Sequence, residues 1–231
     1  MDHGDVEKFL RSVDPFHLLP EDALEEIVRA LVVRRCRAKE IVFIEGGEGS
    51  AAYLVVTGRI AMFKSSPNGK ELIVDLVAPG CFFGAVALMG NGPYPLTARA
   101  QLDSQLLVLD KIKFTPFLKR LPELQRSLIG VVTARMQATQ NLARALAHDP
   151  VETRVASLLL SLLPRLGLNN RSEPPELHIS RQEIADLTGM TLETASRVVK
   201  GLEREGVLDA ARQGVLAIRD LDALRRLVAP L

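Results

Sequence analysis

The fold is decided by one stretch of sequence, residues 179–208, which reads ISRQEIADLTGMTLETASRVVKGLEREGVL. Ser180 followed by Glu183 fits a capping box, in which each side chain takes the other residue's backbone N–H at the start of a helix. Gly189 supplies a sharp turn, and Thr191 can cap a second helix, predicted to end at Gly206. Two short helices joined by a tight glycine turn predict a helix-turn-helix.

The second helix divides cleanly into two faces. Its apolar positions recur at helical spacing and should pack inward: Ala195, Val198, Val199 and Leu202. Its polar positions have the same spacing on the opposite face: Glu193, Ser196, Arg197 and Lys200. Arg can bond to guanine through two hydrogen bonds, and Glu can accept from cytosine, so this face has the groups needed to read a major groove. The alternative is an ordinary solvated helix face.

Two short apolar segments after the second helix favour the DNA-binding interpretation. Val207-Leu208 and Val215–Ile218, with Gln213-Gly214 between them, predict the strands of a wing. The expected DNA-binding residues of this winged helix-turn-helix are Ser180, Arg181, Thr191, Glu193, Thr194, Ser196, Arg197 and Lys200.

The region from Val32 to Asp110 reads as many short strands separated by turns, which suggests a sandwich or barrel. Pro67-Asn68-Gly69 is a strong hairpin signal, because Asn-Gly accepts positive φ at both central turn positions. The expected strands are Ile41–Ile44, Ala52–Val56, Arg59–Lys64, Leu72–Val77, Leu96–Leu102 and Gln105–Leu109.

A long helix is predicted between these two regions, from Pro122 to Ala147, and it ends at His148-Asp149-Pro150 because proline disfavours helix in the residue before it. Apolar or small residues recur along it at spacings of three and four: Ile129, Val132, Met136, Thr139, Ala143 and Leu146. This heptad seam favours a parallel homodimer, and the alternative is one buried face of an ordinary helix.

Composition excludes several classes of protein. The 231 residues are 47% apolar, which is enough for a real core, and two cysteines cannot make a disulfide framework or a four-cysteine metal site. The polar, acidic start is not a signal peptide and no apolar run reaches membrane-spanning length, so we expect a cytoplasmic protein with no membrane contact. The net charge of +1 argues against a nucleic-acid binder, because such domains are usually basic, and it has to be weighed against the local sequence.

Taken together, nearly the whole chain resembles the Crp/Fnr superfamily of bacterial transcription regulators. The resemblance rests on Phe16–Leu19, Gly46–Val56 with Gly58, Pro79–Gly84, Arg154–Leu160 and Ile179–Gly206. It implies an α+β fold with an N-terminal double-stranded β-helix, or jelly roll, of the cyclic-nucleotide-binding type over residues 1–115. A dimerisation helix would follow over 116–149, and a winged helix-turn-helix over 150–231.

The resemblance also implies partners and a target. These would be a second copy of the chain, double-stranded DNA and RNA polymerase. Glu193 with Ser196 and Arg197 resembles the Fnr-type branch, because the cyclic-AMP receptor branch has Arg at Leu192 and Gly at Ser196. The implied target is a TTGA(T/C)-type inverted repeat.

The signal sensed by the roll is less defined. The resemblance implies an effector pocket at Phe83, Gly84, Ala85, Tyr94, Thr97 and Thr139. Cyclic AMP is held in the family by a Glu and an Arg, and these positions fall on Ala85 and Tyr94. A buried, unpaired phosphate would cost several kcal/mol, so we expect no cyclic AMP binding in the family mode. Thr139 matches a nucleotide-contacting Thr, but it also lies on the seam.

The family has two other known signals. An Fnr-type iron–sulfur cluster is excluded because only Cys36 and Cys81 are present, although a thiol switch stays open. Haem stays open because Phe82–Met89 and Pro93–Pro95 form an apolar wall. Its candidate axial ligands are His3, His17, His148, Met89 and Tyr94. A constitutive regulator without a sensor is also open.

Enzyme alternatives fail on residue content. The roll type resembles cupin metalloenzymes, which need several histidines inside the roll, and no His lies between Val32 and Asp110. No Ser/His/Asp arrangement is found, and Gly46–Gly49 lacks the Lys of a phosphate-binding loop. We therefore expect no metal site and no catalysis. The remaining alternative from another class is a cyclic-nucleotide-binding regulatory module, which the winged domain disfavours.

Overall fold

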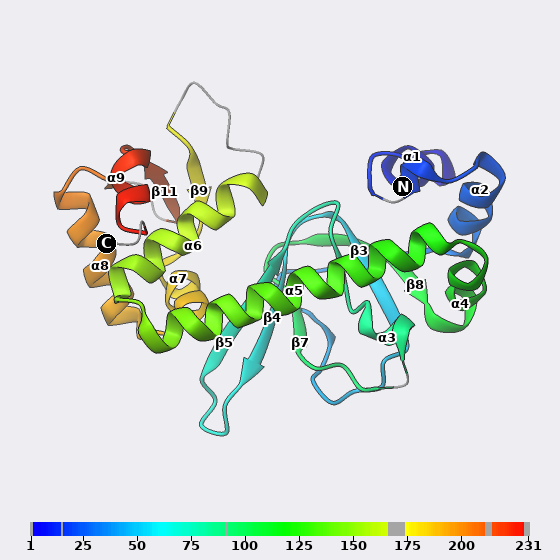
Figure 1. Ribbon diagram of the computed structural model, residues 1–231, viewed down its shortest axis with the longest axis horizontal. Helices are drawn as coiled ribbons and strands as arrows, with labels where there is room; N and C mark the ends of the chain where they lie inside the picture. The colour runs from blue at the N-terminus through cyan, green and yellow to red at the C-terminus, as the bar shows by residue number, and fades with distance from the viewer. Residues whose placement is uncertain (1, 15, 91, 166–173, 211–213, 229–231) are drawn as a thin grey trace. The chain divides into compact units, whose positions relative to one another are not determined.

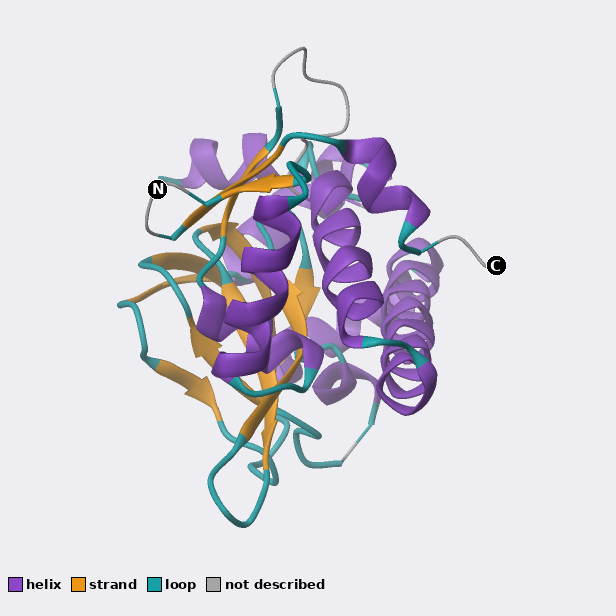
Figure 2. Cartoon of the chain, turned by 90° about the vertical axis from the view of Figure 1, so that its left-hand side faces the viewer, coloured by secondary structure: helices purple, strands orange, loops and turns teal. Residues whose placement is uncertain are grey.

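A computed structural model describes residues 2–14, 16–90, 92–165, 174–210 and 214–228. Its contacts divide the chain into two compact units, residues 1–64 with 75–139, and residues 65–74 with 140–231. The chain is of the α+β class, with the helices and strands drawn in Figure 2. Gln213, which the sequence places between the two wing strands, lies outside the described residues.

Two four-stranded sheets form a roll, and all of it belongs to the first unit except residues 65–74, which include the end of β4 and the first half of β5. One sheet has the order β1-β8-β3-β6 and the other the order β2-β7-β4-β5. The strands are β1 (Val32–Cys36), β2 (Ile41–Phe43), β3 (Ala51–Thr57), β4 (Ile60–Ser65), β5 (Glu71–Val77), β6 (Phe82–Phe83), β7 (Thr97–Ala100) and β8 (Ser104–Asp110). The six strands expected from the sequence are all present within a few residues, whereas β1 and β6 were not expected.

Helices precede and follow the roll in the sequence, and one short helix lies between β6 and β7. They are α1 (His3–Leu10), the 3₁₀-helix η1 (Phe16–Leu18), α2 (Glu21–Ala30), α3 (Val86–Met89), α4 (Lys111–Arg120) and the start of α5 (Pro122–His148). Their buried side chains form one apolar cluster with Leu54, Phe82, Leu107 and Leu109 of the roll. A second cluster fills the space between the sheets. The roll therefore has apolar packing on both faces of the β1-β8-β3-β6 sheet.

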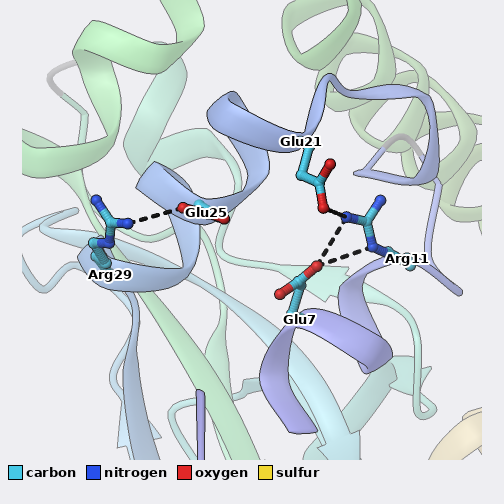
Figure 3. A network of polar contacts seen from close by, with 5 residues as sticks. All are labelled: Glu7, Arg11, Glu21, Glu25 and Arg29. Atoms are coloured by element: carbon cyan, nitrogen blue, oxygen red, sulfur yellow. Dashed lines mark hydrogen bonds and ion pairs between the residues drawn. The ribbon is translucent and has the colours of Figure 1, made fainter. Parts of the chain in front are cut away.

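Exposed ion pairs join the two N-terminal helices (Figure 3). Arg11, at the end of α1, lies 2.8 Å from Glu7 of the same helix and 3.8 Å from Glu21 of α2. Arg29 pairs with Glu25 one turn earlier in α2, at 2.8 Å. Exposed pairs of this kind contribute at most about 1 kcal/mol each, so the apolar cluster beneath them supplies most of the stabilisation.

The long helix α5 follows the sequence prediction closely. Pro122 occupies its first position, where the missing N–H costs nothing, and it runs for 27 residues to His148. Figure 1 shows its N-terminal half beside the roll, where Leu124 and Leu128 are buried in the helical cluster. In the described part of the chain, no helix is both long and apolar enough to span a membrane.

The second unit is a small helical domain with a three-stranded antiparallel sheet of order β10-β11-β9. It contains α6 (Val151–Arg165), β9 (Glu176–His178), α7 (Arg181–Thr188), α8 (Leu192–Arg204), β10 (Leu208–Asp209), β11 (Val215–Ile218) and α9 (Leu221–Arg226). The two wing strands predicted from the sequence are β10 and β11, and β9 is an additional strand.

Gly58 is the position in the roll where a side chain would be tolerated least. It has φ +89°, and an added Cβ would lie 2.2 Å from Ser104 Oγ and 2.6 Å from the Asp103 carbonyl. We expect Gly58→Ala to lower the free energy of unfolding by at least about 2 kcal/mol, measured by urea denaturation.

Two alanine substitutions provide matched controls for Gly58→Ala. Gly69→Ala, with φ +77° and open space, should cost only about 1 kcal/mol, and Gly130→Ala inside α5 should stabilise slightly. Equal effects at Gly58 and Gly69 would show that the close approach to Ser104 is unimportant.

Candidate nucleic-acid interface and effector cradle

Both helices of the helix-turn-helix begin at side-chain caps. Ser180 Oγ accepts from the Glu183 N–H at 3.1 Å, and Glu183 Oε2 accepts from the Ser180 N–H at 2.7 Å, which is the capping box expected from the sequence. Thr191 Oγ1 accepts from the Thr194 N–H at 3.2 Å and starts α8. These caps fix where α8 begins, and therefore which residues its first two turns present.

The turn between the helices depends on glycine. Gly189 has φ +62° and ψ +39°, the left-handed conformation that closes a helix C-terminus. An added Cβ there would lie 2.6 Å from Leu146 Cδ2 at the end of α5, so the turn packs closely against that helix. Leu146 is one of the residues expected on the dimer seam, and its contact with this turn leaves it half-buried within its own chain.

Arg154, known from the sequence only as the start of a segment that carries the family resemblance, also holds this turn. Arg154 of α6 donates from Nη1 to the Thr188 carbonyl at 2.8 Å, and so satisfies one of the last carbonyls of α7. The contact crosses 34 positions in the sequence. No local pattern predicts such a contact, because it depends on how α6 packs against α7.

The faces of α8 divide as expected. Ala195, Val198, Val199 and Leu202 are buried. Among the expected DNA-binding residues, four are exposed (Thr191, Glu193, Arg197 and Lys200) and four are half-buried (Ser180, Arg181, Thr194 and Ser196). Leu192 in the first turn of α8 is also 47% exposed.

Glu193 and Arg197 form a pair in the free protein. Arg197 Nη2 donates to Glu193 Oε1 at 3.0 Å across one turn of α8. Their side chains are 84% and 73% exposed, so the pair contributes only a few tenths of a kcal/mol and opens easily. Both groups are therefore available for base edges. Arg181 is held differently, 3.5 Å from Glu203 Oε2.

The residues expected to line an effector pocket lie around β6. Phe83 is fully buried and stacks on Tyr53 at 5.0 Å between ring centroids. Gly84 has φ +68°, and a Cβ there would lie 3.2 Å from the Ala51 carbonyl. Tyr94 stacks on Phe43 at 3.8 Å. We call Phe83, Gly84 and Tyr94, together with the rings of Phe43 and Tyr53 packed on them, the cradle. Packed aromatic rings therefore line it.

The remaining expected pocket residues occupy different positions. Ala85 is buried in the cluster that contains the helices. Thr97 Oγ1 accepts from the Glu45 N–H at 3.0 Å. Thr139 is exposed on α5, where its Oγ1 donates to the Arg135 carbonyl at 2.9 Å.

Two of the expected pocket residues lack the groups that the family resemblance implies for holding a cyclic nucleotide. Ala85 has no acceptor for a ribose hydroxyl. Tyr94, at the position of the phosphate-binding cation, uses its hydroxyl within the protein: it donates to the Ala51 carbonyl at 2.6 Å and accepts from the Ala51 N–H at 3.1 Å. Burial, with the neighbouring Tyr94, raises the pKa of Tyr53 to about 12, so this phenol also stays neutral.

The haem candidates do not provide a convincing axial ligand. His3, His17 and His148 are exposed on helices, and the Tyr94 hydroxyl is engaged with Ala51. Met89 is 47% exposed. Within the described part of the chain, no group of three His, Cys, Asp or Glu side chains could hold a metal ion.

The two cysteines are both free and differ in environment. Cys36 is buried, and burial raises the pKa of its thiol, which lowers its reactivity as a thiolate. Cys81 is exposed at the turn before β6. A disulfide-based thiol switch between them has no support in these environments.

Most of the seam expected on α5 is accessible. Ile129 and Met136 are 51% and 55% exposed, and Thr139 and Ala143 are exposed as well. Val132 is half-buried, because it packs against the apolar cluster of the N-terminal helices. Ile129 and Met136 lie two turns apart on one side of α5, and apolar side chains exposed together in this way are typical of an interaction surface.

Comparison with known proteins agrees with this architecture. Residues 33–120 match the cyclic nucleotide-binding domain family, and residues 153–227 match the Crp-like helix-turn-helix domain family. The solved structure of FixK2 from Bradyrhizobium japonicum has a TM-score of 0.78 at 23% identity, covering 87% of this chain and 98% of that one. The fold is therefore that of the roll, long helix and helix-turn-helix proteins.

Two curated relatives show the family. The cyclic AMP receptor protein of Thermus thermophilus is 31% identical over 80% of this chain and 83% of its own length. The nitrogen fixation regulation protein FixK of Azorhizobium caulinodans is 33% identical over 76% of this chain and 70% of its own length. The relatives are regulators rather than enzymes, and the chain belongs to the Crp/Fnr family of DNA-binding transcription regulators.

Proposed function

We propose that this protein is a homodimeric regulator that binds a TTGA(T/C)-type inverted repeat through α8. The observation that carries the proposal is the exposed Glu193–Arg197 pair, with Ser196 beside it, on the first turns of a capped recognition helix. Arg197 would bond to guanine O6 and N7, and Glu193 would accept from cytosine N4. Thr191, Thr194 and Lys200 would contact the backbone around them, with Ser180 and Arg181 at the start of α7.

The dimer would form through α5, with the seam of Ile129, Val132, Met136, Thr139, Ala143 and Leu146 facing a second copy. The exposed Ile129 and Met136 support this, since pairing would remove both from water. Two recognition helices would then enter successive major grooves about 34 Å apart. Thr139 and Ala143 make the seam weaker than one of leucines, so other contacts between the copies would contribute.

A signal sensed in the roll would control this DNA binding in the cytoplasm, with RNA polymerase as the downstream partner. The cradle around Gly84 gives no support for cyclic AMP in the family mode or for haem. Charge also shapes the interaction: residues 148–231 contain 11 Lys and Arg against 12 Asp and Glu. Affinity would therefore rest on a local patch and on dimerisation, and non-specific binding would be weak.

Loss of the recognition arginine tests the DNA contact. We expect Arg197→Ala to weaken binding to a TTGAT palindrome by about 1–3 kcal/mol, roughly 5- to 150-fold, and to relax specificity at its base. Fluorescence anisotropy at fixed salt measures the affinity. Arg225→Ala, which removes an exposed arginine paired with Asp222 on α9, is the matched control. Wild-type affinity in Arg197→Ala would show that Arg197 reads no base.

A charge on the seam tests the dimer. Met136→Glu places two carboxylates opposite each other in a parallel pair. We therefore expect the free energy of dimerisation to become less favourable by about 2 kcal/mol or more. Light scattering after size exclusion should then detect monomer at micromolar concentration. Ala134→Glu, exposed on the opposite side of α5, should leave the dimer intact. Two variants with unchanged mass would locate the interface elsewhere.

Calorimetry tests the cradle. Since Ala85 and Tyr94 replace the acceptor and the cation, titration of the purified dimer with cyclic AMP should give no saturable heat. Saturable binding at micromolar concentration would mean that the nucleotide is held by other residues.

A further inference from the structure

The short strand β6 touches both apolar cores of the first unit. Successive side chains of a strand point to opposite faces. Phe83 is buried in the cluster between the two sheets, whereas Phe82 is buried in the cluster of the N-terminal helices and α5. Phe82 lies 5.6 Å from Phe16 between ring centroids. A displacement of β6 would therefore disturb both cores together.

On the inner side, aromatic rings connect Phe83 to the cradle. Tyr94 is tied to Ala51 by two hydrogen bonds and stacks on Phe43 at 3.8 Å. Phe43 in turn stacks on Phe83 at 5.9 Å. Because close-packed rings cannot move independently, we expect a displacement of Tyr94 to displace Phe83 as well.

On the outer side, one arginine connects β6 to the long helix. Arg135 of α5 donates from Nη2 to the Phe82 carbonyl, and its Nε lies 3.5 Å from Asp75 Oδ2 of β5. The side chains of Arg135 and Asp75 are only 29% and 17% exposed, so water screens this contact less than a surface pair. Arg135 lies next to Met136 of the seam in α5.

We propose that Arg135 is the positioning residue through which the interior of the roll sets the placement of α5, and hence DNA binding. The route runs from Tyr94 through Phe43 and Phe83 to the Phe82 carbonyl, and Arg135 carries it to the helix. The inference rests on the proposed function, because it supplies the link between the roll and the seam. A purely structural role would give Arg135 a stability effect that is independent of Tyr94.

A double-mutant cycle separates the two roles without requiring knowledge of the effector. Tyr94→Phe removes both hydrogen bonds to Ala51 and keeps the ring, so it perturbs the cradle in place of a ligand. We expect it to change the affinity of the full-length protein for a TTGAT palindrome by about threefold or more. In an Arg135→Met background the same change should alter affinity by less than about 1.5-fold.

The matched control is Arg126→Met, which removes an exposed arginine paired with Glu123 on the same helix. In that background the Tyr94→Phe effect should keep its full size. Asp75→Asn keeps the bond to the Phe82 carbonyl and should give an intermediate result. Independent effects of Tyr94→Phe and Arg135→Met on affinity would overturn the proposal, and so would the absence of any Tyr94→Phe effect.

A second measurement keeps the inference testable if DNA binding fails. Hydrogen exchange of the α5 amides around Arg135 should change in Tyr94→Phe and stay unchanged when that substitution is added to Arg135→Met. If Arg135→Met does not fold, Arg135→Gln replaces it. Coupling in exchange without binding to the palindrome would reject the proposed target and support the role of Arg135. Binding with no coupling would reject the role of Arg135 alone.

Discussion

The first unit depends on the packing of β6, where two adjacent phenylalanines belong to different cores. Phe83 closes the space between the sheets, and Phe82 packs under the helices. Burying two such side chains stabilises the fold by several kcal/mol, but burial alone does not make the two cores one body. The strand β6 links the two cores, because Phe82 and Phe83 are adjacent in it and neither ring can move without the other. The left-handed Gly84 directly after the strand allows this close approach to Ala51 and Phe43.

Much of this architecture could be predicted from the sequence. The capping box at Ser180, the turn at Gly189 and the two faces of α8 are local patterns, and the structure contains all three. The roll strands that are bounded by glycine and proline turns were also predicted from the sequence. β6 and β9 were not predicted: β9 (Glu176–His178) has one apolar residue between two polar ones, and β6 is two residues that form a strand by pairing with the distant β3. β1 was not predicted either, because two of its five residues are arginines and the sequence does not show its pairing with β8.

The same distinction separates the candidate functional residues that could be predicted from the sequence from those that could not. Candidate DNA-binding side chains that share one helix face, such as Glu193 and Arg197, could be found from their spacing. Arg154 and Arg135 could not, because each donates to a backbone carbonyl that is distant in sequence. Carbonyl acceptors have no signature in the side-chain sequence. The same limitation applied to Tyr94: its position was found by spacing, but its attachment to Ala51 was not. That attachment turns a candidate ligand contact into part of the roll's own packing.

The pairing of the sheets also determines the order in which the chain can fold. Both β1 and β3 pair with β8, so that Val32 lies opposite Val108 and Leu54 opposite Leu107. During synthesis this sheet cannot form until β8 has left the ribosome, and until then its apolar strands have no lasting partners. The helices and turn of the C-terminal unit form through contacts close in sequence and carry a much smaller loop-closure cost. The roll, although it is made first, is therefore the slower half to complete.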